Sequence, residues 1–209
     1  MRFALGVVDV VYAPRPLEDR VRLAGEDGFA HIDVMVDVDP DTLPLAVGCP
    51  TAFPKPRPGW CSTPAPREGP GMWQRTVELF RGAPGALLEP WAGAVVNSAE
   101  KCRAIMAEVP GLRLLVDTGH VADWGGDPLE LLSFAGHVQL RQGRPGSTQV
   151  HPADPSGVVD FAAVIDRLDT VDYPGVLSVE YFDLPENGWP LEDPRGHALA
   201  LAAQVRALL

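Results

Sequence analysis

The sequence LRLLVDTGHVADWGGDPLELLSFAGHVQLRQG, residues 112–143, contains the pattern that decides the fold. Residues 112–120 form an apolar run that predicts a strand, and residues 127–136 have the spacing of a helix. Residues 137–143 alternate between polar and apolar side chains, which predicts a second strand. A strand, a helix and a strand in this order are typical of a βαβ unit with two parallel strands.

The same alternation of strands and helices continues on both sides of this unit. Further strands are predicted at residues 3–9, 31–37, 43–49, 59–64, 85–91 and 175–182, and helices at residues 17–28, 72–83, 98–109, 159–171 and 196–209. Eight strands favour a single domain, residues 1–209, with the α/β fold of a (β/α)8 TIM barrel. The alternative is an open doubly wound sheet, but no glycine-rich phosphate loop follows any strand.

The first half of this barrel is short, and much of it is rich in proline. Residues 49–71, CPTAFPKPRPGWCSTPAPREGPG, cannot hold a long helix or a central strand. The predicted barrel therefore has abbreviated helices in its first half. We expect residues 50–70 to line or cover the mouth of the barrel near Glu89, with Trp60 or Arg67 facing the pocket or a partner subunit. Uncovered strands on this flank would favour a homodimer.

Composition excludes several classes of protein. The 209 residues carry a net charge of −11, which argues against a nucleic-acid partner, and no apolar run is long enough to cross a membrane. The start resembles a signal peptide, but Asp9 interrupts its apolar run and no small-residue cleavage site follows. The three cysteines lack metal-site spacing and fit a reducing, cytoplasmic location.

Oxygen-bearing side chains come late in four consecutive predicted strands. These residues are Glu89, Asp117, Gln139 and Glu180. Active groups of a parallel barrel lie at the carboxyl ends of its strands, and buried carboxylates are rare without partners. One divalent metal ion would satisfy all four residues, and an all-oxygen set favours Mn, Mg or Co over Zn. Gln139 would then be a neutral metal ligand.

Each of these residues also has a simpler interpretation when it is taken alone. A single carboxylate at a strand end commonly caps a loop or joins an ion pair, and Gln139 would serve equally well as a hydrogen-bonded core amide. His120 would bond the backbone after its turn. We interpret His137 as structural because it comes early in its strand.

At these residues the sequence resembles the xylose-isomerase-like TIM barrels, which include sugar-phosphate isomerases and epimerases. The motifs that carry the resemblance are LLEPW, LLVDTGH, HVQLRQ and SGVVDFAAVIDRLDTVDYPGVLSVEYF, and they span roughly residues 86–182. The resemblance implies that Glu89, Asp117, the residue at position 139 and Glu180 bind the metal. Most members have His at the third position. The strand HVQLRQGRPG is similar to that of the hydroxypyruvate isomerase branch, which uses Gln, although Trp91 replaces an Asn of that branch.

The resemblance implies a metal-dependent isomerase or epimerase of a small hydroxy-carbonyl compound, acting through an enediolate. Glu89 and Glu180 would be the catalytic acid and base, and His120 would bind a substrate oxygen. Alternation along residues 137–143 places Arg141 beside Gln139, where it would bind a substrate carboxylate or balance the anionic intermediate. The alternatives are a dehydratase on the same scaffold and a non-catalytic binding subunit. The family's endonuclease branch fits the acidic composition less well.

Overall fold

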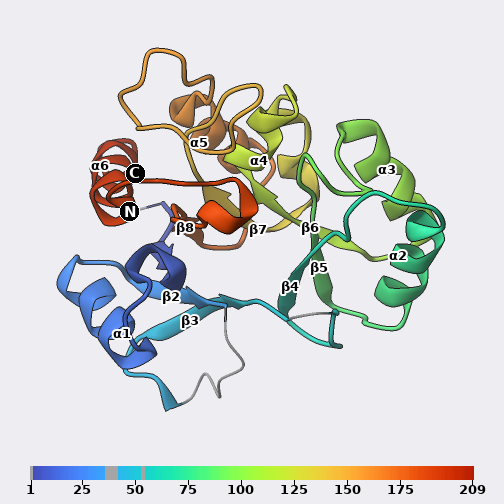
Figure 1. Cartoon of the computed structure of the whole chain (residues 1–209), viewed down its shortest axis with the longest axis horizontal. Coiled ribbons are helices and arrows are strands. Elements are labelled where there is room, and N and C mark those ends of the chain that lie inside the picture. Colours follow the sequence, from blue (N-terminus) through green and yellow to red (C-terminus); the bar gives the residue numbers. More distant parts are fainter. Residues whose placement is uncertain (1, 36–41, 53–54) are drawn as a thin grey trace.

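Eight parallel strands form a nearly closed barrel in the computed structural model, which describes residues 2–35, 42–52 and 55–209. The strands are β1 (Leu5–Val8), β2 (His31–Val34), β3 (Ala46–Pro50), β4 (Cys61–Pro64), β5 (Ala86–Glu89), β6 (Arg113–Asp117), β7 (Ala135–Leu140) and β8 (Leu177–Val179). Their order in the sheet is β3-β2-β1-β8-β7-β6-β5-β4, so β1 and β8 are neighbours (Figure 1). The two end strands meet at a parallel bridge between Thr51 and Ser62. This arrangement confirms the predicted (β/α)8 fold.

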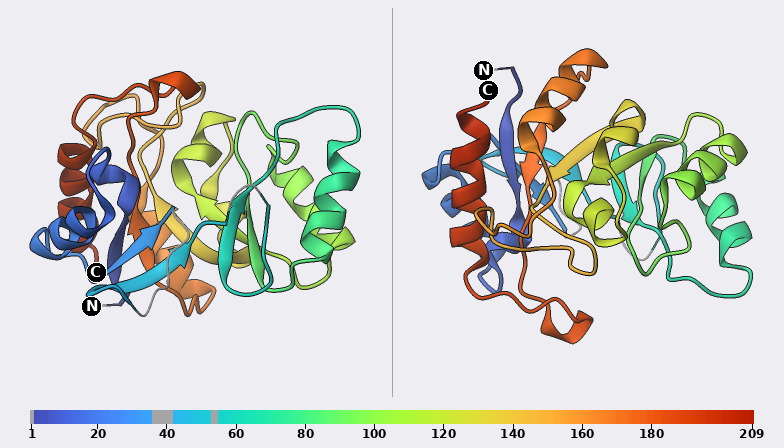
Figure 2. Two further views of the ribbon diagram at one scale, coloured as in Figure 1. Left: turned by 60° about the horizontal axis from the view of Figure 1, so that its bottom comes forward. Right: turned by 90° about the horizontal axis from the view of Figure 1, so that it is seen from above.

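Six α-helices accompany the strands in the described parts of the chain. They are α1 (Leu17–Glu26), α2 (Met72–Arg81), α3 (Ala99–Glu108), α4 (Thr118–Asp123), α5 (Phe161–Thr170) and α6 (Pro194–Arg206). Helices α2 and α3 lie on one side of the barrel, and α1 and α6 lie on the other (Figures 1 and 2). The described parts of the chain contain no α-helix between β2 and β3 or between β3 and β4, which confirms the abbreviated first half. None of the helices in these parts is long and apolar enough to span a membrane.

Several predicted elements differ in the structure. The strand predicted at residues 112–120 ends at Asp117, because the Asp117 side chain accepts a hydrogen bond from the His120 amide and caps α4. The helix predicted at residues 127–136 is instead a pair of 3₁₀ turns, η3 (Pro128–Glu130) and η4 (Leu132–Phe134), since β7 begins directly afterwards at Ala135. The predicted strand at residues 31–37 ends at Val34, and its residues 36 and 37 lie outside the described parts.

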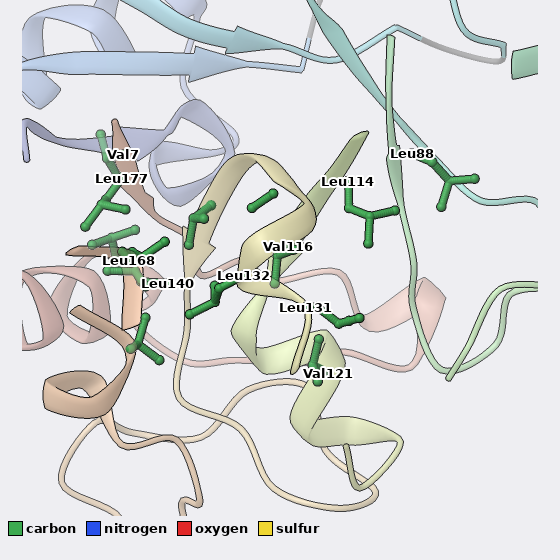
Figure 3. Close-up of a cluster of buried hydrophobic side chains, with 14 of the residues drawn as sticks. Val7, Leu88, Leu114, Val116, Val121, Leu131, Leu132, Leu140, Leu168 and Leu177 are labelled. Atoms are coloured by element: carbon green, nitrogen blue, oxygen red, sulfur yellow. The ribbon is translucent and has the colours of Figure 1, made fainter. Parts of the chain in front are cut away.

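The main core lies between the outer face of the barrel and the surrounding helices. Leu114 and Val116 of β6 point into this core, where leucine and valine side chains of neighbouring strands and helices meet them (Figure 3). Leu115, between them, belongs to a separate small cluster with Cys49 and Leu87. Alternation along the strands therefore sends one set of side chains outward to the helices and the other set inward.

The inward set is polar over much of the barrel. His31 of β2 lies next to Ser178 of β8, with 3.0 Å between its Nε2 and the Ser178 Oγ. The imidazole fits because the neighbouring strands present Gly6 and Gly48. A Cβ atom added to Gly6 would come within 2.3 Å of the ring. Glycine at this position is therefore a packing requirement of the barrel interior.

We expect Gly6→Ala to lower the free energy of unfolding by about 1–3 kcal/mol, because a rigid ring cannot move away from the new methyl group. Gly25→Ala is the matched control, since nothing lies within 4 Å of the corresponding Cβ on the exposed side of α1. That control should be neutral or stabilising by up to about 1 kcal/mol. Urea denaturation of both variants measures the difference, and equal stabilities would contradict the packing argument.

Candidate active site

Four predicted site residues meet at the carboxyl ends of the strands. Glu89 ends β5, Asp117 ends β6, Gln139 lies opposite Asp117 in β7, and Glu180 directly follows β8. Glu89, Gln139 and Glu180 line one cavity of about 360 Å³, and His120 lines it with them. Asp117 is fully buried below this cavity. The strand ends therefore bring the predicted residues to one place.

Asp117 is held from two sides. Its Oδ1 accepts the His120 amide hydrogen at 2.9 Å, and its Oδ2 accepts a hydrogen bond from Nη2 of Arg141. The first bond also starts α4, so the turn that positions the carboxylate is the one that positions His120. The motif DTGH thus places an acid and an imidazole together at the end of one strand.

The donor atoms of Glu89, Asp117 and His120 lie within 4.8 Å of one another, close enough to share a metal ion. Nε2 of His120 is 3.6 Å from Oε1 of Glu89, and its Nδ1 is 3.0 Å from the Thr148 hydroxyl. Because the Thr148 hydroxyl contacts Nδ1 of His120, the other ring nitrogen, Nε2, is left to face Glu89. His120 was predicted to bind substrate, and the structure makes it a candidate metal ligand as well. The ligand roles of Gln139 and Glu180 stay predictions.

Arg141 is completely buried and does not line the cavity. Its Nη2 pairs with Asp117 and lies 3.1 Å from Oε2 of Glu180, and its guanidinium carbon is 4.4 Å from the centre of the Phe182 ring. The predicted inward direction of this side chain is correct. Its partners, however, are the protein's own carboxylates, and its proposed contact with substrate stays a prediction.

Burial shifts the titration of the cavity residues. It raises the pKa of Glu89 to about 8, with a further contribution from the Asp117 charge, and it raises the pKa of Glu180 well above its usual range. Burial lowers the pKa of His120 to about 3, so the imidazole is neutral. Burial opposes ionisation of Asp117 too, but Arg141 and His120 outweigh it and lower the pKa of that carboxyl. Two protonatable glutamates thus face the cavity beside an ionised aspartate.

Asp33 was not predicted as a site residue. Its Oδ2 is 2.7 Å from Nε2 of His137 and accepts a hydrogen bond from Nε2 of Gln139 at 3.3 Å. This contact with Asp33 orients the Gln139 amide, and His137 has the structural role expected of it. The available signal was the HID sequence of β2, which places His31 and Asp33 on the same face.

The proline-rich segment lines the cavity as predicted. Pro64, Ala65, Pro66 and Arg67 form part of the same wall as Glu89, and the Arg67 guanidinium carbon lies 5.0 Å from the centre of the Trp91 ring. Trp60 faces elsewhere: it is 50% exposed and donates its indole hydrogen to the Gly48 carbonyl. Residues 53 and 54 of this segment lie outside the described parts.

Aromatic rings also line the cavity. Trp189 packs against Trp91, Phe182 and His120, with ring centres 5.4–5.9 Å apart.

Residues 81–204 match the family model of the xylose isomerase-like TIM barrel. The chain belongs to this family. No curated protein matches it in sequence.

Solved structures share the fold of this xylose isomerase-like barrel over nearly its whole length. The 3-keto-D-glucoside 4-epimerase of E. coli is 16% identical with a TM-score of 0.72, covering 98% of this chain and 99% of that chain. A D-allulose 3-epimerase from Methylomonas sp. is also 16% identical, with a TM-score of 0.70 and coverages of 100% and 98%. A probable 3-DHS dehydratase from Bacillus anthracis is 13% identical, with a TM-score of 0.65 and coverages of 94% and 97%.

The charges and donor atoms of this barrel fit a divalent cation. Glu89, Asp117 and Glu180 supply three negative charges when ionised, and Arg141 supplies one positive charge. The remaining two negative charges are buried, and a divalent cation would balance them. Glu89, Asp117 and His120 would hold it, since their donor atoms already lie within 4.8 Å of one another.

Without metal, Glu89 should make the protein less stable as pH rises. Its pKa of about 8 exceeds the ordinary value of 4.5, so between these values the folded state keeps a proton that the unfolded state loses. From about pH 5 to 8, the melting temperature of wild type should therefore fall relative to that of Glu89→Gln. Thermal denaturation of both proteins in EDTA measures this change.

Added Mn²⁺ should reverse this trend, because the cation binds the deprotonated carboxylate and stabilises the folded state. Its effect on the wild-type melting temperature should be larger at pH 8 than at pH 5 and much smaller in Glu89→Gln. An equal Mn²⁺ effect on both proteins would show that Glu89 is not part of the metal site.

Proposed function

We propose that this barrel is a divalent-metal-dependent isomerase or epimerase of a small hydroxy-carbonyl compound, such as a sugar or a hydroxy-keto acid. The observation that carries the proposal is the pair of buried glutamates, Glu89 and Glu180, lining one cavity beside His120. A bound cation would polarise the substrate carbonyl and stabilise negative charge on its oxygen. The residues of the chain supply the proton transfers.

Glu180 is the proposed base and Glu89 the proposed acid. They come from β8 and β5, which are separated by β7 and β6 in the sheet, so they approach the cavity from different directions. Glu180 would take the proton next to the carbonyl, and Glu89 would return a proton at the neighbouring carbon or on the opposite face through the carboxyl oxygen that does not bind the metal. Raised pKa values suit both groups to exchange protons near neutral pH.

The cavity supports a small substrate. Its volume of about 360 Å³ is at the lower end of the range typical of ligand pockets. Trp91, Phe182 and Trp189 supply apolar surface, whereas the carboxylates, His120 and Gln139 supply oriented polar atoms. This combination suits a compound with several hydroxyl groups and one reactive carbonyl. The epimerases that share the fold support the same substrate class.

A dehydratase is the second candidate function, and the probable dehydratase that shares the fold favours it. Removal of the same proton by Glu180 would be followed by loss of a β-hydroxyl instead of reprotonation. Glu89 would then donate its proton to the departing hydroxyl. Incorporation of solvent deuterium into the product at the carbon next to the carbonyl separates the epimerase or isomerase from the dehydratase, whose product is an enone and water.

The proposal includes a small-molecule substrate as the partner, no binding to nucleic acid or to a membrane, and assembly into a homodimer. On the flank where helices are missing, Trp60 is one of three large apolar side chains that are exposed in the described parts of the chain. A cytoplasmic location stays a prediction.

We expect Glu180→Gln and Glu89→Gln to keep the fold and to lower turnover by about 10²- to 10⁴-fold, because an amide cannot exchange the proton. Proton NMR in D₂O, with Mn²⁺ and a panel of ketoses and hydroxy-keto acids, measures deuterium uptake and turnover. Glu78→Gln, on the exposed face of α2, is the matched control and should have wild-type activity. Near wild-type rates in either cavity variant would rule out the two-glutamate mechanism.

A further inference from the structure

Neighbouring residues fix the position of both the backbone and the side chain of Arg141. A Cβ atom on Gly119 would lie 2.8 Å from Nε of Arg141, so glycine leaves the room that the side chain needs. The Thr118 hydroxyl donates to the Arg141 carbonyl at 2.8 Å and is 2.9 Å from the Arg141 amide, whose hydrogen it accepts. The Phe182 ring covers the guanidinium. The backbone, the aliphatic part of the side chain and the guanidinium of this arginine are therefore all fixed.

The contacts of the guanidinium are concentrated on the carboxylate cluster. Nη2 pairs with both Asp117 and Glu180, whereas Nε and Nη1 are buried without a hydrogen-bond partner among the residues that the structure describes. Burying a guanidinium with unpaired hydrogens is unfavourable unless its charge is strongly stabilised. The nearby carboxylates of Asp117, Glu180 and Glu89 provide that stabilisation. The side chain is thus placed for its charge more than for its hydrogen bonds.

We propose that Arg141 is a resident counter-ion of the carboxylate cluster. As a positioning residue, it holds Asp117 and Glu180 in place when no metal is bound, and it weakens the binding of a divalent cation. This proposal rests on the metal site of the proposed function but requires no particular substrate. It differs from the sequence-based role of Arg141 as a substrate anchor, because the positive charge acts inside the protein.

The expected effects follow from Coulomb's law. A positive charge within a few ångströms of the cation site repels a divalent cation, and it occupies oxygen atoms of Asp117 and Glu180 that would otherwise face the metal. Removing it should tighten metal binding by at least about tenfold. The same removal leaves the ionised Asp117 without its nearest positive charge and makes ionisation of Glu89 and Glu180 still less favourable, so the metal-free protein should become less stable.

The experiment compares wild type with Arg141→Met and Arg141→Lys. Mn²⁺ affinity is measured by isothermal titration calorimetry, and melting temperature is measured in EDTA and in Mn²⁺. Arg141→Met should bind Mn²⁺ at least about tenfold more tightly, melt at a lower temperature in EDTA, and gain more from Mn²⁺ than wild type does. Arg141→Lys keeps the charge and should have nearly wild-type affinity.

Arg20→Met is the matched control for loss of a charge partner. Arg20 pairs with buried Asp9 at 2.7 Å, so this change also leaves a buried carboxylate without its arginine, but one that does not belong to the cluster of three. Arg20→Met should lower the melting temperature, but Mn²⁺ should raise its melting temperature no more than it raises that of wild type. If Arg141→Met does not fold in EDTA, refolding in Mn²⁺ should rescue it, and failure of that rescue would overturn the proposal.

Unchanged or weaker Mn²⁺ binding by Arg141→Met would also overturn the proposal that Arg141 is a counter-ion.

Failure of the proposed function gives a different result. A wild-type protein that binds Mn²⁺ but exchanges no substrate proton would disprove the isomerase, while the affinity difference between wild type and Arg141→Met would still establish the counter-ion.

Discussion

The burial of three carboxylates at the ends of β5, β6 and β8 is the constraint on which the rest of the site depends. Ionised groups in such a place are unstable without partners. The chain supplies some of these partners itself: the amide of His120 and the guanidinium of Arg141 bind Asp117, and Arg141 also reaches Glu180. Among the described residues Glu89 has no comparable partner, and burial raises its pKa to about 8. The site therefore lacks the positive charge that would balance it, which is the physical basis for a cation.

A second polar layer supports this site from inside the barrel. Asp33 links His137 to Gln139, and it also accepts the Cys49 amide hydrogen at 2.8 Å. Asp33 of β2 thus connects β3 and β7 through hydrogen bonds inside the barrel. The Gln139 amide nitrogen donates a hydrogen bond to Asp33, and the Gln139 side chain also lines the cavity. The ligand role predicted for Gln139 thus depends on a residue outside the cavity.

Much of the fold and most of the site could be predicted from the sequence, for different reasons. Strand-end acids such as Glu89 and Glu180 follow apolar runs, so their position is visible locally. The helix at Thr118–Asp123 was missed because one capping bond from Asp117 outweighs the extended pattern of the preceding residues. Asp33 was missed because its partner His137 is 104 residues away in the sequence. Such pairs appear only when the barrel closes.

Barrel closure and the shape of the cavity depend on the same proline-rich segment. Thr51 joins β3 to β4 through its bridge to Ser62, and the Trp60 indole bonds the Gly48 carbonyl across the same junction. A few residues later, Pro64–Arg67 form the cavity wall beside Glu89. Proline restricts φ in advance, so such a segment orders at a lower entropic cost than a flexible loop. The chain can therefore lack helices in its first half and still close the wall of the candidate site.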